Sequence, residues 1–291
     1  EKFAKKYKKK FAISFNSGTS TLHAALISCG VKPGDEVISP ALTVIMDTSA
    51  TIHSHAIPVY ADIDEDDFNI RPDEIEKKIT KKTKAIIVVS VFGQSPKMDL
   101  IKKIANKHKI RIIEDNAESM FSTYNNKIIG HYGDISSFSF ENSKHLSCGE
   151  GGVTITNDEQ LAKKMRKFSN HGFIKLNSNS DSIKFKREDL LDPDLKRHDE
   201  IGWNYRMPEF NAAIVLAQVE RAEKLTKLRI QSANFFLHVI QKYPDFFIPQ
   251  KTYKNSINSY WALAAKYHGD KIRGISQKDF KKKLKVIQNG H

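Results

Sequence analysis

The sequence predicts an α/β fold, with helices on both sides of a mostly parallel central sheet. The first observation is a set of short, continuous apolar runs such as residues 85–89, which are typical of strands buried on both faces. The second is that segments with apolar residues at helical spacing lie between these runs, joined by short connections. The third is the length of 291 residues, enough for one large domain and part of a second.

The first half of the chain alternates helix and strand. Leu22 and Leu26 lie on one face of the first helix, and Gly30 is suited to end it. Pro72 suits a helix start, because the missing N–H would be unpaired there anyway. Residues 14–18 are expected to lead out of a first strand. The expected helices after it are residues 19–29, 43–53, 73–79 and 99–108. The expected strands are residues 36–39, 58–61, 85–89 and 110–114.

The second half continues the alternation. Asn157 could cap one helix. Pro208 opens another, which starts at Met207 and is long enough to serve both the core and a subunit interface. The expected strands are residues 135–140 and 153–156, and the expected helices are residues 158–169 and the segment from Met207.

The charge of +13 indicates solvated helix surfaces rather than nucleic-acid binding, because the lysines do not form one stripe interleaved with aromatic residues. The densest cluster, residues 1–11, is expected to be a helix with Phe3 and Tyr7 turned inward. No apolar run is long enough for a membrane span. The two cysteines suggest no disulfide framework, so the expected location is cytoplasmic.

The segment DISSFSFENSKHLSCGEGG (134–152) holds one lysine, Lys144, between an expected buried strand and a glycine-rich tract. Desolvation there would favour the neutral amine over the ammonium. A neutral lysine amine can form a Schiff base with an aldehyde. Since a lysine in a turn is more often a solvated surface charge, other groups must decide between the two interpretations.

Two further groups lie where strands end, the place where α/β sheets bind ligands. The segment from Ser17 to Ser20 opens the first helix, and its free N–H groups and hydroxyls could hold a phosphate or form a plain N-terminal cap. Glu114 and Asp115 end an apolar strand, where a carboxylate could pair with a cationic ring nitrogen or be solvated. A phosphate cradle, an acid and a lysine are the three parts that pyridoxal 5′-phosphate needs.

The sequence resembles the DegT/DnrJ/EryC1/StrS family of sugar aminotransferases, which are fold-type I pyridoxal-phosphate enzymes. The resemblance covers roughly residues 12–280, and its motifs are specific in order and spacing. The matching segments are SGTSTLHAAL (17–26), VKPGDEVISPALT (31–43), PVYADIDEDDFNI (58–70), TKAIIVVSVFGQSPKMD (83–99), IIEDNAES (112–119), SFSFENSKHLSCGEGG (137–152), NHG (170–172) and GWNYRMPEFNAAIVLAQVE (202–220).

The resemblance implies a role for each matching position. Lys144 would form the imine with the cofactor and carry the proton, and Asp115 would pair with the pyridinium nitrogen. The phosphate would lie against Gly18, Thr19 and Ser139, with Asn204 reaching the phosphate of the neighbouring subunit in a homodimer. The implied domains are a large cofactor-binding domain (1–225) and the start of a smaller C-terminal α+β domain (226–291), which is expected to be incomplete, as is the N-terminal arm.

Two positions depart from the family pattern. Val44 stands where an aromatic ring usually stacks on the cofactor, and valine can pack there but not stack. Glu118 stands where the family has glutamine or histidine. Burial and repulsion from Asp115 are expected to keep Glu118 protonated, so that it could donate a hydrogen bond as glutamine does.

The predicted function is transfer of an amino group from glutamate or glutamine to a keto nucleotide sugar, for amino-sugar or cell-surface polysaccharide biosynthesis. One alternative is a sugar dehydratase of the same family, in which histidine replaces the lysine; His145 next to Lys144 makes the register important. Another is a catalytically weakened cofactor-binding or regulatory protein. The sequence identifies neither the sugar, the ring position nor the donor, and residues 173–199 are the expected specificity insertion.

Overall fold

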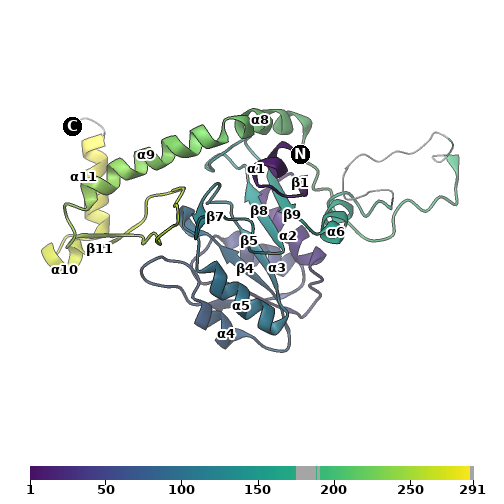
Figure 1. The fold of residues 1–291 in the computed structure, drawn as a ribbon, viewed down its shortest axis with the longest axis horizontal. Helices are drawn as coiled ribbons and strands as arrows, with labels where there is room; N and C mark the ends of the chain where they lie inside the picture. The colour runs from purple at the N-terminus through teal and green to yellow at the C-terminus, as the bar shows by residue number, and fades with distance from the viewer. Residues whose placement is uncertain (175–187, 189–190, 289–291) are drawn as a thin grey trace.

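The protein is described by a computed structural model that covers residues 1–174, 188 and 191–288. Its central sheet has seven strands in the order β1-β9-β8-β5-β4-β2-β3. The neighbours β3, β2, β4, β5 and β8 run parallel, and β9 is antiparallel to both β8 and β1. The predicted α/β fold with a mostly parallel sheet is therefore confirmed (Figure 1).

The elements follow the predicted alternation within one or two residues at most ends. The strands of the central sheet are β1 (Phe11–Phe15), β2 (Glu36–Pro40), β3 (Ile57–Ala61), β4 (Thr83–Val89), β5 (Arg111–Asp115), β8 (Ile135–Ser139) and β9 (Gly152–Thr156). The helices around it are α1 (Lys2–Lys6), α2 (Gly18–Ser28), α3 (Ile45–His53), α4 (Pro72–Lys78), α5 (Met98–His108), α6 (Glu159–Ser169) and α8 (Glu209–Glu220). A short ribbon of β6 (Thr123–Tyr124) and β7 (Lys127–Ile128) and the 3-10 turn η1 (Val91–Gly93) lie between them.

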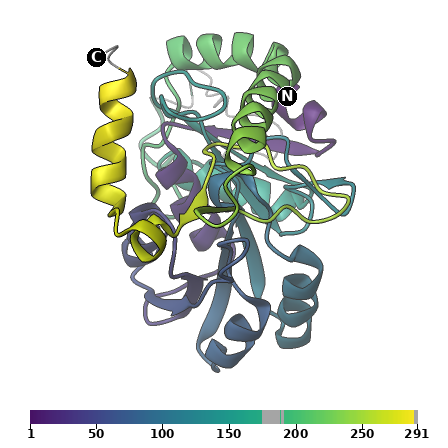
Figure 2. The same ribbon diagram turned by 90° about the vertical axis from the view of Figure 1, so that its left-hand side faces the viewer.

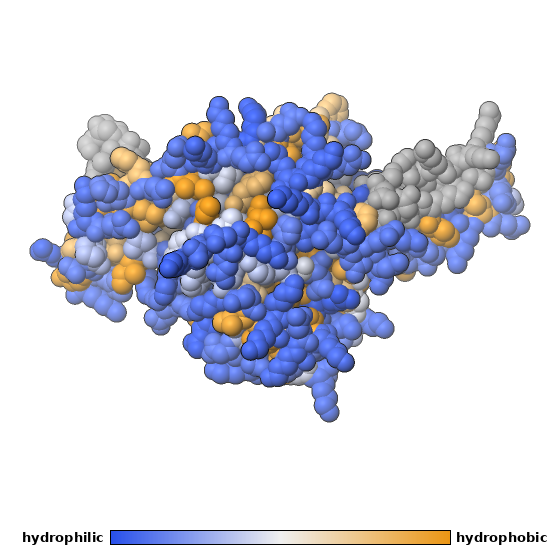
Figure 3. Space-filling model, in the orientation of Figure 1, coloured by the Kyte–Doolittle hydropathy of each residue, from blue (hydrophilic) through white to orange (hydrophobic). Residues whose placement is uncertain are grey.

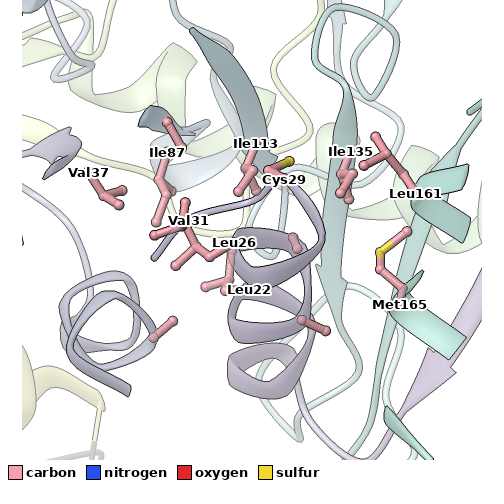
Figure 4. Close-up of a cluster of buried hydrophobic side chains, with 14 of the residues drawn as sticks. Leu22, Leu26, Cys29, Val31, Val37, Ile87, Ile113, Ile135, Leu161 and Met165 are labelled. Carbon is pink, nitrogen blue, oxygen red and sulfur yellow. The ribbon is translucent and has the colours of Figure 1, made fainter. Parts of the chain in front are cut away.

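Both faces of the central strands are buried, which explains the continuous apolar run at residues 85–89 of β4. Helices α2, α3 and α6 pack on one face, where Leu22 and Leu26 contact side chains such as Ile113 (Figure 4). The adjacent residue Ile112 points to the opposite face, into a second cluster with residues of α4 and α5. Helices α1 and α8 cover the rest of that layer, with Phe3 and Tyr7 buried as predicted.

The C-terminal part extends away from the sheet. The long helix α9 (Ala222–Ile240) leads outward, and β10 (Phe247–Pro249), β11 (Ala265–Tyr267), α10 (Gly269–Arg273) and α11 (Gln277–Gln288) gather near its far end (Figures 1 and 2). Strands β10 and β11 pair with each other and not with the central sheet. The predicted domain boundary after residue 225 falls within the continuous helix α9, and the division stays a prediction.

Two local predictions were wrong. Asp158, not Asn157, caps α6: its carboxylate accepts from the N–H groups of Gln160 and Leu161, while Asn157 accepts from Lys10 N–H. Helix α3 begins at Ile45 rather than at Thr43, because Val44 has an extended backbone. Of the expected specificity insertion, residues 175–187 and 189–190 lie outside the described residues.

The surface in the view of Figure 3 is largely hydrophilic, with separate apolar patches. No helix in the part of the chain that the structure describes has the length and hydropathy needed to cross a membrane.

Candidate functional site

The site lies at the carboxyl ends of β5 and β8, which are adjacent parallel strands. Asp115 is the last residue of β5 and pairs in register with Ser137, two residues before Ser139 ends β8. Gly18 packs directly on Ser139: a Cβ on Gly18 would come within 2.8 Å of the Ser139 Cβ. The close approach that glycine permits therefore brings the start of α2 against the end of β8.

The start of α2 has the properties of an anion site. Ser17 caps the helix through its hydroxyl, which accepts from Ser20 N–H, and the Ser20 hydroxyl accepts from Ser17 N–H in return. Gly18 and Thr19 are the first two helical residues, so their N–H groups have no partner within the helix. These two donors and the adjacent Ser139 hydroxyl can bind a phosphate at the positive end of the helix.

Lys144 lies in the turn after β8 and is enclosed rather than solvated. Its side chain is 11% exposed, and its Nζ lies 3.4 Å from a carboxylate oxygen of Glu118. On the other side, Nζ lies 4.4 Å from the centroid of the Trp261 ring. The lysine is thus held between an anion and an aromatic face, which places a single reactive amine at a defined point of the site.

Glu118 acts as an acceptor, contrary to the expectation that it is protonated and donates. One carboxylate oxygen accepts from Phe92 N–H at 3.0 Å, and the other accepts from Lys144 Nζ at 3.4 Å. Both neighbours are donors, and an ionised carboxylate can satisfy both. Glu118 is also buried and does not point to solvent.

The adjacent acids Glu114 and Asp115 have different surroundings. Glu114 accepts from the N–H groups of Gly130, Tyr132 and Gly133, so its carboxylate holds a loop and not a ligand. Asp115 accepts from Ala117 N–H. Burial raises the pKa of Asp115 to about 6, helped by the charge of Glu118, while the Ala117 N–H and Lys144 act to lower it. Asp115 is therefore mostly ionised at neutral pH.

Val44 and Asn204 are predicted site residues for which the described part of the chain gives no contact to Lys144, Glu118 or Asp115. Val44 is half-buried at the N-terminal cap of α3. Asn204 is exposed and forms an isolated bridge with Asn170. The carbonyl oxygen of its neighbour Tyr205 accepts from Asn16 N–H. The segment around Asn204 therefore lies beside the residues that lead into the start of α2.

Sequence reasoning missed Trp261, the residue that covers Lys144. Its indole N–H donates to Ser143 O at 3.0 Å, and its ring stacks at 5° to that of Phe92. Gly93 permits this docking, since a Cβ there would come within 2.4 Å of Tyr260 N. Only tertiary packing brings this late residue to the site, so no local pattern could have found it.

Asp47 was also missed. It lies in the first turn of α3, is fully buried, and interacts with the carboxyl group of Asp115. Its sequence neighbours Ile45 and Met46 are exposed, so the local pattern does not indicate a buried acid.

The side chains of Lys144 and His145 point to different surroundings. The His145 ring points away from Glu118, with Nε2 at 3.1 Å from Ser259 O. Burial lowers the pKa of His145 to about 4, so the ring is neutral. Lys144, and not His145, is the residue beside Glu118 and Trp261.

These residues fit pyridoxal phosphate. The crowded contact of Gly18 with Ser139 forms one wall of a phosphate cradle. An ionised acid at the end of β5 suits a cationic ring nitrogen, and an enclosed amine at Lys144 suits an aldehyde. The chemistry of the donor set therefore matches the three functional groups of this cofactor.

Comparisons with known proteins agree with this fit. GDP-perosamine synthase from Escherichia coli O157:H7 is 34% identical over 263 residues, which are 90% of this chain and 67% of that protein. The structure of an aminotransferase from Psychrobacter cryohalolentis matches with a TM-score of 0.82 and 30% identity, over 95% of this chain and 69% of that one. GDP-4-keto-6-deoxymannose-3-dehydratase, solved with a trapped PLP-glutamate geminal diamine, matches with a TM-score of 0.85 and 26% identity, over 98% and 74%.

The likeness confirms the predicted fold of pyridoxal-phosphate-dependent transferases and the predicted cofactor. This chain spans about half to two thirds of the length of the curated relatives it matches. A family profile, described as the DegT/DnrJ/EryC1/StrS aminotransferase family, matches residues 1–286. The chain therefore belongs to the DegT/DnrJ/EryC1/StrS aminotransferase family.

Proposed function

We propose that this chain carries the active site of a transaminase that moves an amino group from glutamate or glutamine to a keto nucleotide sugar. The product would serve amino-sugar or cell-surface polysaccharide biosynthesis. The observation that carries the proposal is the enclosure of Lys144 between Glu118 and Trp261, next to strand ends that hold an acid and a phosphate cradle. Relatives with matching sequence include a GDP-perosamine synthase, whose name indicates a nucleotide-linked amino sugar.

Each predicted residue has a role in binding. The N–H groups of Gly18 and Thr19 and the hydroxyl of Ser139 hold the phosphate, and Val44 packs its methyl groups beside the cofactor ring. Asp115 keeps a proton on the ring nitrogen by offering it an ionised carboxylate, which requires a pH above the Asp115 pKa of about 6. When bound, pyridoxal phosphate supplies an aldehyde that combines with amines and a ring that withdraws electrons.

Lys144 performs the proton transfer. Its side chain is anchored in the turn after β8, and its amine can either be bound covalently to the cofactor's aldehyde carbon or be free. In the free state it can move a proton between the substrate carbon that bears the nitrogen and C4′ of the cofactor. Glu118 positions the amine by accepting from it, and its second oxygen is fixed by Phe92 N–H.

The dehydratase alternative is disfavoured by the register of these side chains. A dehydratase of this family would have histidine at the position of Lys144, and the neighbouring His145 faces Ser259 instead. One matched structure is a dehydratase, so the fold alone does not separate the two activities. The presence of lysine rather than histidine at position 144 is what favours the transaminase over the dehydratase.

We further propose the domain division at residues 1–225 and 226–291, with the first part binding the cofactor. The separate pairing of β10 with β11 supports the division. A cytoplasmic location is proposed as well, since both cysteines are free and buried rather than paired.

The proposed function predicts an amino product from a nucleotide-linked keto sugar. Purified protein loaded with pyridoxal phosphate should convert a suitable sugar in a single turnover when glutamate or glutamine is present. Mass spectrometry of a panel of keto sugars measures the amino product and identifies the ring position. Loss of water from the sugar without gain of nitrogen would replace the transaminase proposal by the dehydratase alternative.

The proposal also includes a homodimer in which Asn204 reaches the partner's phosphate. Lys144→Ala and Asn204→Asp subunits, each inactive alone, should regain part of the activity when mixed. The gain is expected because one of the two sites in a mixed dimer would receive an intact Lys144 and an intact Asn204. Activity is measured after subunit exchange has been shown by native mass spectrometry.

Exchange without any rescue would contradict the contribution across the interface. It would place Asn204 in the site of its own chain, where Tyr205 already contacts Asn16. Mixing each variant with itself is the matched control and should give no gain.

A further inference from the structure

Asp47 is a buried carboxyl group that the proposed chemistry does not use. Its side chain has no exposed surface, and one oxygen, Oδ2, accepts from the Thr43 hydroxyl. The other oxygen, Oδ1, is buried and has no hydrogen-bond partner among the residues that the structure describes. A buried carboxylate oxygen without a donor is costly, so the group requires an explanation.

The explanation lies in its neighbour. The carboxyl groups of Asp47 and Asp115 lie within hydrogen-bonding reach of each other, one on α3 and one at the end of β5. Two ionised carboxylates offer each other only acceptors, so neither can satisfy the other. A single proton on Asp47 changes the repulsive contact into a hydrogen bond from a carboxylic acid to a carboxylate.

The groups around Asp47 favour this protonated state. Burial and then the charge of Asp115 raise the pKa of Asp47 well above its ordinary value, and the charge of Glu118 acts in the same direction. The Thr43 hydroxyl opposes them. Burial raises the pKa of Asp115 to about 6, but Ala117 N–H and Lys144 act against this rise, so Asp115 is better able to stay ionised.

We propose that Asp47 is a neutral carboxylic acid that positions Asp115. Its O–H donates to the Asp115 carboxylate and fixes the orientation of that group toward the cofactor's ring nitrogen. Asp47 acts through Asp115 and does not touch the reacting atoms. The part that concerns the cofactor rests on the proposed role of Asp115, whereas the protonation of Asp47 is a property of the protein alone.

The first test measures protonation in cofactor-free protein. Native Asp47 keeps a proton that the unfolded chain loses above the ordinary aspartate pKa of 3.8, so Asp47 makes the protein less stable as pH rises from there. Asp47→Asn removes this dependence. The Tm of Asp47→Asn minus that of the wild type should therefore increase between pH 4 and pH 8, by several degrees.

Asp245→Asn makes the same chemical change at an exposed position and is the matched control. Its Tm difference from the wild type should stay constant over this range. A constant difference for Asp47→Asn as well would overturn the proposal, because an ionised Asp47 would have no excess proton to lose.

The second test separates positioning from folding. Asparagine keeps an N–H donor for Asp115, whereas Asp47→Leu keeps the size but has no donor. Titration of the cofactor-free proteins with pyridoxal phosphate should give similar dissociation constants for wild type and Asp47→Asn. Asp47→Leu should bind roughly tenfold to a hundredfold more weakly, the worth of one hydrogen bond to a charged group.

Equal affinity of Asp47→Leu and Asp47→Asn would overturn the positioning role. If neither the wild type nor any variant binds pyridoxal phosphate, the proposed function is wrong instead. The Tm measurements would still decide whether Asp47 is protonated. The two failures are therefore distinguishable.

Discussion

Replacing Lys144 by alanine should abolish the covalent link to the cofactor and reduce transamination by about 10²–10⁴-fold or more, the usual worth of a positioned proton carrier. Wild-type protein should absorb in the visible and lose that band on treatment with borohydride, which fixes the cofactor on the lysine. Peptide mass spectrometry should find the label on Lys144. The variant should still bind the phosphate end, since the cradle at Gly18 and Ser139 is unchanged.

Lys127→Ala is a suitable control for this experiment. Lys127 also lies over an aromatic ring, 4.8 Å from the centroid of Tyr132, but outside the site. Its loss should leave the absorbance and the label unchanged. A Lys144→Ala protein that still forms a borohydride-reducible link would show that another amine reacts, and the assignment of Lys144 would have to be withdrawn.

Glu114→Ala should give the largest loss of stability that the described contacts predict, about 3–5 kcal/mol. Removing the buried carboxylate would leave the N–H groups of Gly130, Tyr132 and Gly133 without their acceptor. The loop that leads into β8 would lose its anchor to β5. Urea unfolding measures the free energy, and Glu65→Ala, at an exposed position, should change it little.

Glu114→Gln sharpens this prediction. Both oxygens of Glu114 accept from backbone N–H groups, at 2.6 Å from Gly133 and 2.7 Å from Gly130. An amide has only one oxygen, so its NH₂ group must face one of these donors. Glutamine should therefore also destabilise the protein, although less than alanine. A glutamine variant as stable as the wild type would mean that the loop does not depend on a carboxylate.

Much of the fold was predictable because its strands are buried on both faces. Residues 85–89 of β4 are all apolar, and a segment with helical spacing of apolar residues separates them from β5, so the alternation is visible in the sequence. The residue that caps α6 was less predictable, because Asn157 and Asp158 are adjacent and both residue types can cap a helix. In the structure the Asn157 side chain accepts from Lys10 N–H, and Asp158 is the cap.

The site was predictable only in part. Lys144 and the start of α2 lie in segments whose local sequence is unusual, whereas Glu114 and Asp115 are adjacent acids at the end of one strand. Both are buried, and their local pattern does not show which one faces a ligand and which one holds a loop; only the family resemblance indicated Asp115. Trp261 and Asp47 reach the site through long-range packing, which leaves no periodic signal.

The cover over Lys144 has a consequence for the order of folding. Trp261 bonds to Ser143, which lies 118 residues earlier in the chain. During synthesis the ribosome releases the strands up to β9 and the lysine turn well before this tryptophan, and early segments can fold as they emerge. The amine is therefore open to solvent in the nascent chain, and it is covered only when the C-terminal segment with Trp261 has been made.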